Sequence, residues 1–120
     1  MTLTSYSKDE ILTICFTDSR ILDETKLEQL GNDLIALLSK TSEERVILDF
    51  RSVQFMSSSM LGKLVLVEKK CKEYKVKLKL CSISPDIRQV FKITRLDKLF
   101  DIEADEAAAR KAFMRRGWFG

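Results

Sequence analysis

Strand-like runs alternate with helix-like runs along this chain, and that order limits the possible folds more than any other feature of the sequence. The run VILDF (46–50) is almost continuously apolar, as in a central strand that is covered on both faces. The segment after it repeats apolar residues with helical spacing, at Met60, Leu64, Val67, Cys71 and Tyr74. A buried strand followed by an amphipathic helix is typical of an α/β fold.

The N-terminal part of the chain contains a similar strand and helix. ILTICF (11–16) predicts a strand of mixed burial. Residues 21–40 predict a helix, with one apolar face formed by Leu27, Leu30, Leu34, Leu37 and Leu38. Asp23 is the expected N-cap of this helix. Gly31 lies inside it and is expected to weaken the helix by about 1 kcal/mol relative to alanine.

The C-terminal part predicts two more strands and two more helices. KVKLKLCSI (75–83) alternates lysine with apolar residues, which predicts a strand with one exposed face. Ser84 and Pro85 form a strong start signal for the next helix, as N-cap and first helical residue. LFDI is a candidate for a short last strand, and residues 104–116 predict a helix that begins with acidic side chains and ends with basic ones.

These elements together predict an α/β domain with one mixed sheet of four or five strands, packed with about four helices. The 120 residues are enough for one domain, which we expect to cover residues 1–114, with a short C-terminal tail at 115–120. No apolar run approaches the ~20 residues of a membrane-spanning helix, and the N-terminus lacks the pattern of a signal peptide. We therefore expect a cytoplasmic protein without a membrane span.

The kinds of side chain present exclude several classes of function. There is no histidine, so the commonest general base and the commonest metal ligand are both missing. The three cysteines are widely spaced and fit reduced thiols, and Cys71 and Cys81 are expected to be small core residues. We expect no metal, no cofactor and no enzymatic activity. Asp49 is expected to be a strand-end residue that bonds to nearby N–H groups.

Three consecutive serines, Ser57, Ser58 and Ser59, occupy the junction between the central strand and the helix after it. One serine is explained as a cap, because the first N–H groups of a helix lack partners and a serine cap contributes about 1 kcal/mol. Three serines exceed that need, and loops after sheet strands often carry function. A phosphoserine adds about −1.5 to −2 charges, which a helix N-terminus tolerates. The junction is therefore suited to a binding switch that leaves the fold intact.

Four segments that occur in the order VILDF, FMSSSMLGKL, LKLCSISPDIRQVF and RLDKLF resemble the STAS domain, and specifically the bacterial anti-sigma factor antagonists. The family pattern is an apolar strand ending in Asp, then Phe-[Met/Leu]-Asp-Ser-[Ser/Thr]-Gly-Leu-Gly, an amphipathic helix, a strand, and a helix that leads to Leu-Asp-x-Leu-Phe. The resemblance covers about residues 8–113. It implies the STAS fold for nearly the whole chain.

The resemblance also implies a mechanism and a set of partners. The unphosphorylated antagonist binds an anti-sigma factor that is also a serine kinase, and this releases the sigma factor. The kinase then phosphorylates the antagonist, which breaks the complex, and a serine phosphatase reverses the reaction. The matching phosphorylation position here is Ser58, with Ser57 and Ser59 as alternatives. The implied partner-binding residues are Asp23, Ser57, Ser58, Ser59, Met60 and Lys63.

The chain departs from the family pattern at several positions. Ser57 stands where the motif has Asp, and Met60 puts a bulky side chain where the motif has Gly and where a kinase loop would approach closely. Arg95 stands where a Gly usually follows the third helix, which costs stability if the backbone there is left-handed. These departures leave an alternative open, in which the chain is a non-phosphorylated STAS scaffold of a transporter or signalling assembly.

Six lysines lie between Lys69 and Lys79, which raises the question of nucleic-acid binding. Such a site needs basic residues on one face with aromatic or groove-entering partners. The only aromatic residue nearby is Tyr74, which falls on the predicted core face of its helix. A helix end and an exposed strand face explain these lysines better, so we expect no direct contact with nucleic acid.

Overall fold

A single mixed sheet with helices on both faces forms the molecule. The computed structural model describes the backbone of residues 3–20 and 24–119, and the side chains of those residues as far as Met114. The elements in chain order are β1 (Leu3–Lys8), β2 (Ile11–Phe16), α1 (Glu24–Lys40), β3 (Arg45–Asp49), α2 (Ser58–Glu73), β4 (Lys77–Cys81), α3 (Pro85–Ile93), the 3₁₀ turn η1 (Leu96–Lys98), β5 (Asp101–Glu103) and α4 (Glu106–Phe119). The predicted α/β class is confirmed.

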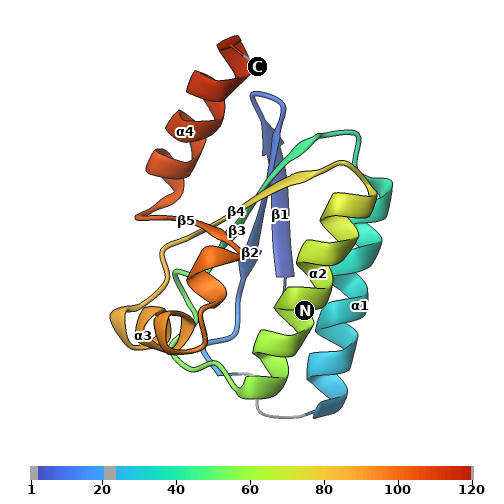
Figure 1. Ribbon diagram of the computed structural model, residues 1–120. Helices are drawn as coiled ribbons and strands as arrows, with labels where there is room; N and C mark the ends of the chain where they lie inside the picture. The colour runs from blue at the N-terminus through green and yellow to red at the C-terminus, as the bar shows by residue number, and fades with distance from the viewer. Residues whose placement is uncertain (1–2, 21–23, 120) are drawn as a thin grey trace.

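The five strands lie side by side in the order in which they occur in the chain. β1 pairs with β2 in the antiparallel direction, and every later pair is parallel. The loops that follow the four parallel strands, β2 to β5, therefore all leave the sheet at the carboxyl ends of the strands. These loops lead into α1, α2, α3 and α4, and the starts of α1 and α2 lie together at the lower end of the molecule in Figure 1.

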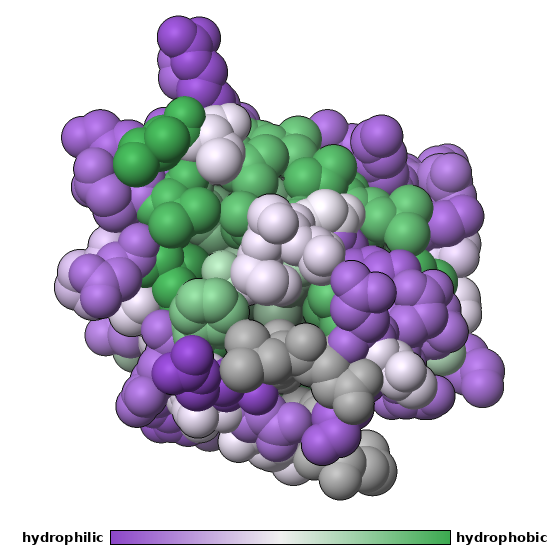
Figure 2. All heavy atoms as spheres, turned by 90° about the horizontal axis from the view of Figure 1, so that it is seen from below, coloured by the Kyte–Doolittle hydropathy of each residue, from purple (hydrophilic) through white to green (hydrophobic). Residues whose placement is uncertain are grey.

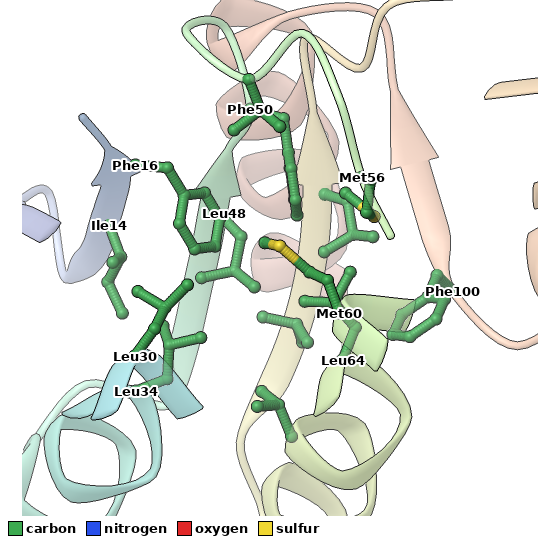
Figure 3. Packing of buried hydrophobic residues seen from close by; sticks show 14 of the residues in the cluster. Ile14, Phe16, Leu30, Leu34, Leu48, Phe50, Met56, Met60, Leu64 and Phe100 are labelled. Atoms are coloured by element: carbon green, nitrogen blue, oxygen red, sulfur yellow. The ribbon is translucent and has the colours of Figure 1, made fainter. Parts of the chain in front are cut away.

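Helices α1 and α2 lie side by side over one face of the sheet (Figure 1). Apolar side chains of both helices and of the strands form the main buried cluster, in which the ring centres of Phe16 and Phe50 are 4.8 Å apart. Figure 3 shows how side chains of both helices meet those of the strands. The predicted apolar faces are confirmed from Leu27 to Leu38 and from Met60 to Cys71. The prediction is wrong for Tyr74, which is the C-cap of α2 and is 39% exposed.

The contact between α1 and α2 explains why Gly31 is present inside α1, although glycine weakens a helix. Gly31 is buried, and a Cβ atom at this position would lie 3.2 Å from Cδ of Lys63. The missing side chain therefore leaves space for the aliphatic stem of Lys63. The ammonium group of Lys63 then reaches Glu28 on α1, with 2.6 Å between Nζ and Oε2.

Helix α4 covers the other face of the sheet with a much smaller apolar cluster, formed by Ile11, Ile47, Cys81, Ala109 and Phe113. The prediction that β4 has one exposed face is wrong at Lys79, which is 3% exposed. Its ammonium group lies 3.6 Å from Asp101 and 3.5 Å from Glu103, and 5.2 Å from the centre of the Phe113 ring. An alternating lysine pattern therefore does not mark a bare sheet face here.

Polar contacts complete the α4 interface. Arg110 donates from Nε to Glu106, from Nη1 to the Lys8 carbonyl and from Nη2 to the Thr13 hydroxyl, at 2.8, 3.1 and 3.0 Å. Tyr6 on β1 donates to the same Glu106 carboxylate. Charged and hydroxyl groups thus surround the small apolar cluster on this face.

The ends of α3 match the sequence signals. The Ser84 hydroxyl accepts a hydrogen bond from the Ile87 N–H at 3.3 Å, and Pro85 is the first helical residue, as predicted. Arg95 has φ 63° and ψ 17°, so the left-handed conformation that usually favours glycine is present with a side chain. The last helix continues to Phe119, beyond the predicted end at residue 116. Among the described residues, no helix is long and apolar enough to cross a membrane.

Candidate functional site

The serine triplet forms the start of α2, and its three members have different roles. Ser57 is the N-cap, with extended backbone (φ −80°, ψ 164°), and its hydroxyl accepts a hydrogen bond from the Met60 N–H at 3.2 Å. The Ser57 carbonyl also accepts from Leu61 at 3.1 Å. The capping function expected for one serine therefore belongs to Ser57.

Ser58 and Ser59 are the first two residues of α2, and both are exposed. The first turn of α2, which the structure describes in full, contains no acidic side chain. The positive end of the helix dipole is therefore not offset by a carboxylate of that turn. These two hydroxyls lie where an added negative charge is electrostatically tolerated.

A second loop from the same sheet edge lies against the segment before the serines. The backbone N–H groups of Gln54 and Phe55 donate to the Ser19 carbonyl at 2.9 and 3.2 Å. The guanidinium of Arg20 lies over the Phe55 ring, 5.1 Å from its centre, at a distance that favours a cation–π contact. The β2–α1 and β3–α2 loops are thus joined beside Ser58.

Sequence reasoning missed Arg20 and Phe55 as members of this site. Phe55 is 40% exposed, and an exposed aromatic ring next to an arginine is common in protein interfaces. The available signal was topological, since Arg20 follows β2 and Phe55 follows β3, and parallel strands end at one edge. Figure 2 shows this end of the molecule, where an apolar area is bordered by hydrophilic groups.

The side chains of Met60 and Lys63, two other residues named from the resemblance, make contacts within the domain. Met60 is 2% exposed and packs in the core near Phe50 and Leu64 (Figure 3). The expectation of a bulky side chain facing a partner is therefore not met, and only the Met60 backbone lies near the site surface. The Lys63 side chain is 27% exposed and is ion-paired with Glu28. Asp23 lies outside the described residues.

Buried polar groups behind the site have structural roles. Asp49 is 2% exposed at the end of β3, and its Oδ1 accepts from the Arg51 N–H at 2.9 Å, as predicted. Burial and the nearby Asp49 raise the pKa of the Cys15 thiol. Burial raises the pKa of Cys71 and of Cys81 to about 12, so both thiols are protonated core groups. Within the described part of the chain, no cluster of His, Cys, Asp and Glu is arranged to hold a metal ion.

Comparisons with known proteins agree with this architecture. The STAS domain family model matches residues 5–109. The "Putative anti-sigma factor antagonist BtrV" of Bordetella bronchiseptica is 32% identical over 113 residues, which cover 94% of this chain and 95% of that protein. An anti-sigma-factor antagonist (STAS) domain protein from Planctomyces limnophilus has a solved structure with TM-score 0.82, 26% identity and coverage of 93% and 97%.

The Bacillus cell fate determinant SpoIIAA in its phosphorylated form has the same fold at TM-score 0.66 and 20% identity, with 92% of this chain and 98% of that chain covered. STAS anti-sigma factor antagonists are regulatory binding proteins and are not enzymes. Sheet order, helix placement and sequence similarity thus lead to one assignment: the chain belongs to the STAS domain family of anti-sigma factor antagonists.

Proposed function

We propose that this protein binds an anti-sigma factor that is also a serine kinase, and that phosphorylation of Ser58 ends this binding. One observation carries the proposal. Ser58 is exposed at the first position of α2, while the neighbouring Ser57 already caps the helix. The hydroxyl of Ser58 therefore accepts a phosphate without removing the hydrogen bond that starts the helix.

The charge of the phosphate explains how a small modification switches binding. A phosphoserine carries about −1.5 to −2 charges. At the start of α2 the helix dipole and free N–H groups accommodate this charge, so the domain stays folded. A partner that docks on the same surface must desolvate a dianion, and the complex is weakened. That SpoIIAA is described in a phosphorylated form with this fold supports the compatibility of phosphate with the folded domain.

The other two serines remain alternatives with different consequences. The Ser57 hydroxyl is half-buried and accepts from Met60, so its modification disturbs the cap, at a cost of about 1 kcal/mol. Ser59 is exposed like Ser58, and phosphate there keeps the cap. The sequence register of the family motif favours Ser58 over Ser59.

The proposed partner surface is the edge of the molecule around these serines. It comprises Ser57, Ser58, Ser59, the Met60 backbone and Lys63, with Arg20 and Phe55 added from the structure. Asp23 stays in the proposal as a position in the same β2–α1 connection. A serine phosphatase would restore the unphosphorylated state, and the consequence is regulation of transcription through a sigma factor in the bacterial cytoplasm.

A second candidate is a scaffold that binds its partner constitutively within a transporter or signalling assembly. Ser57 in place of the motif Asp favours it, because the carboxylate that precedes the family phosphorylation site is missing. In this case Ser58 is not phosphorylated, and the partner stays bound.

Binding by Ser58 variants separates the two candidates. We expect Ser58→Ala to bind the anti-sigma kinase like the unmodified protein, and Ser58→Asp to lose at least about tenfold in affinity, equivalent to about 1.4 kcal/mol. Ser42→Asp is the matched control, since Ser42 is exposed and lies between α1 and β3, at the other edge of the sheet. If Ser58→Asp binds as tightly as Ser42→Asp, the switch is refuted.

Phosphorylation-site mapping on the protein isolated from its own cells places the modification. Cleavage after Arg51 and Lys63 yields the peptide SVQFMSSSMLGK, which holds the three candidate serines together with Ser52. Phosphate on Ser58 that varies with growth conditions supports the proposal. A peptide that remains unmodified with phosphatases inhibited favours the constitutive scaffold.

A further inference from the structure

A groove of about 620 Å³ lies between the edge strand β1 and helix α1, away from the serine site. Its lining comes from β1 and from the second half of α1, at Leu3, Thr4, Ser5, Asp33, Ala36, Leu37 and Lys40. Leu3 and Leu37 contribute to the apolar core beneath it. Ala36 is exposed although it is apolar, so the groove is an apolar surface with one charged group toward each end.

The strand that forms one wall of this groove has an open edge. β1 is the first strand of the sheet, and among the described residues it pairs only with β2. Natural edge strands are usually protected by charged residues, proline or bulges. Residues 3–7 (LTSYS) contain no charge and no proline, and the first charge of β1 comes at Lys8. The outer backbone groups of this segment are therefore available to pair with another strand.

The charges of the groove are arranged in a self-complementary way along α1. Asp33 and Lys40 lie three residues before Ala36 and three residues after Leu37. If a second α1 lies antiparallel to the first, with the two-fold axis between Ala36 and Leu37, each Asp33 faces the Lys40 of the other copy. Such matching of a surface with itself is what an isologous two-fold interface requires.

The helix and the strand impose the same symmetry. α1 returns from the end of β2 to the start of β3, and so it runs in the direction of β1, which is antiparallel to β2. One two-fold axis perpendicular to the sheet therefore brings two α1 helices and two β1 strands together in antiparallel pairs. In the strand pair it passes near Thr4, the middle of the three groove residues of β1.

We propose that this groove is the interface of a homodimer, in which β1 strands of two copies pair edge to edge and extend the sheet across both. Strand pairing satisfies the open backbone edge, the two α1 helices cover the apolar lining, and two Asp33–Lys40 pairs fix the register. This interface is separate from Ser58, which lies at the start of α2. The two serine sites remain exposed, at opposite ends of the dimer.

A charge-swap experiment tests the interface on the full chain. Molar mass is measured by sedimentation equilibrium over a concentration series that extends to millimolar. We expect a monomer–dimer equilibrium in the unmodified protein. Asp33→Lys and Lys40→Asp each turn two attractive contacts into two repulsive ones, and each should raise the dissociation constant by about tenfold or more. The double variant restores opposite charges at both contacts and should dimerise nearly as well as the original.

Two results overturn the dimer. One is a chain that stays monomeric at millimolar concentration. The other is a dimer that neither single variant weakens beyond the control Lys92→Asp, a similar charge change on the exposed side of α3. If instead the chain is monomeric and a second protein occupies the groove, the partner's binding, and not self-association, responds to Asp33→Lys.

A crosslink tests the position of the axis. Ala36 lies next to the proposed two-fold axis, so two copies of Ala36→Cys should form a disulfide-linked dimer under mild oxidation. Gly62→Cys is the control, because Gly62 is exposed on α2 and a Cβ atom added there would have no neighbour within 4 Å. Equal crosslinking of the two variants contradicts the proposed register.

Discussion

The two faces of the sheet bury different kinds of side chain. Under α1 and α2 the buried apolar side chains form one continuous cluster that includes the tilted ring pair of Phe16 and Phe50. Under α4 five apolar residues share the space with Lys79, Thr13 and the Arg110 network. Apolar burial stabilises in proportion to area, whereas buried charges contribute little net stability after desolvation. The first face should therefore hold the fold, and the second should hold α4 only.

The largest effect is expected from a cavity in the first face. Leu64 is 1% exposed on α2, and Leu64→Ala should lower the free energy of unfolding by about 2–5 kcal/mol, measured by urea denaturation. Leu66→Ala is the matched control on the same helix, since Leu66 is 39% exposed, and it should change stability by about 0.5 kcal/mol or less. Similar losses from both variants would remove the distinction.

A smaller effect is expected from the corresponding cavity in the second face. Phe113 is 2% exposed, but Phe113→Ala should cost only about 1–3 kcal/mol, below the usual 3–5 kcal/mol for a packed phenylalanine. The reason is that α4 is a terminal helix on a small cluster and can separate locally. Hydrogen exchange should show faster exchange in α4 while β3 stays protected. Met114→Ala, at a 48% exposed neighbour, is the control, and uniform loss of protection across the sheet would contradict local separation.

Removing the buried charge of the second face should change stability by less than about 1 kcal/mol. Lys79→Met keeps an unbranched stem under α4, and the side chains of Asp101 and Glu103 remain 63% and 29% exposed and therefore hydrated. Lys79→Ala also loses the stem and should cost about 2 kcal/mol. Thermal unfolding of both variants measures the difference. A loss above about 3 kcal/mol in Lys79→Met would show that the charge itself is essential.

The smallest effect concerns the thiols, which should be protected to the same extent in both faces. Cys71 is buried in the first face and Cys81 in the second, and burial raises both pKa values to about 12 from the ordinary 9.0. Alkylation of the native protein near pH 8, followed by mass spectrometry, should therefore modify only Cys15, which is partly exposed. Equal labelling of all three thiols would contradict the burial.

The same pKa values predict a pH dependence of stability. Because the folded pKa is raised, the unfolded chain loses its thiol protons first, and stability falls as the pH rises from about 9 to about 12. In Cys71→Ala the fall over this range should be shallower than in the unmodified protein. An unchanged pH profile would mean that the Cys71 thiol contributes nothing to it.

The first face was predictable because its elements show a strong periodic pattern. The burial of the α1 leucines and of the stripe from Met60 to Cys71 could be predicted from the spacing within each helix, without knowing which residues they contact. The second face was not predictable in this way, because the burial of Lys79 depends on a helix that is some thirty residues away in the chain. β1 was missed for a related reason, since five of its six residues are exposed and no burial pattern marks it.

The candidate site was predicted in part. The serine triplet was located by its place between a strand and a helix, but the division between Ser57 as cap and Ser58 as exposed hydroxyl required the start of α2 to be known. For Met60 the helical spacing predicted the core, where the side chain lies, whereas the family motif implied a bulky side chain at the partner surface. The Arg20–Phe55 contact joins two loops, and no local pattern predicts which loops meet.

Because Gly31 and Lys63 fit closely together, the effect of a substitution at one position depends on which of the two positions changes first. Gly31→Ala alone gains about 1 kcal/mol of helix propensity, but its methyl group would lie 3.2 Å from the Lys63 stem and oppose that gain. If position 63 first acquires a shorter side chain, the same alanine is accepted. Reversion to lysine then becomes harder, because the space has been filled. The two residues should therefore show epistasis and change together among descendants of this chain.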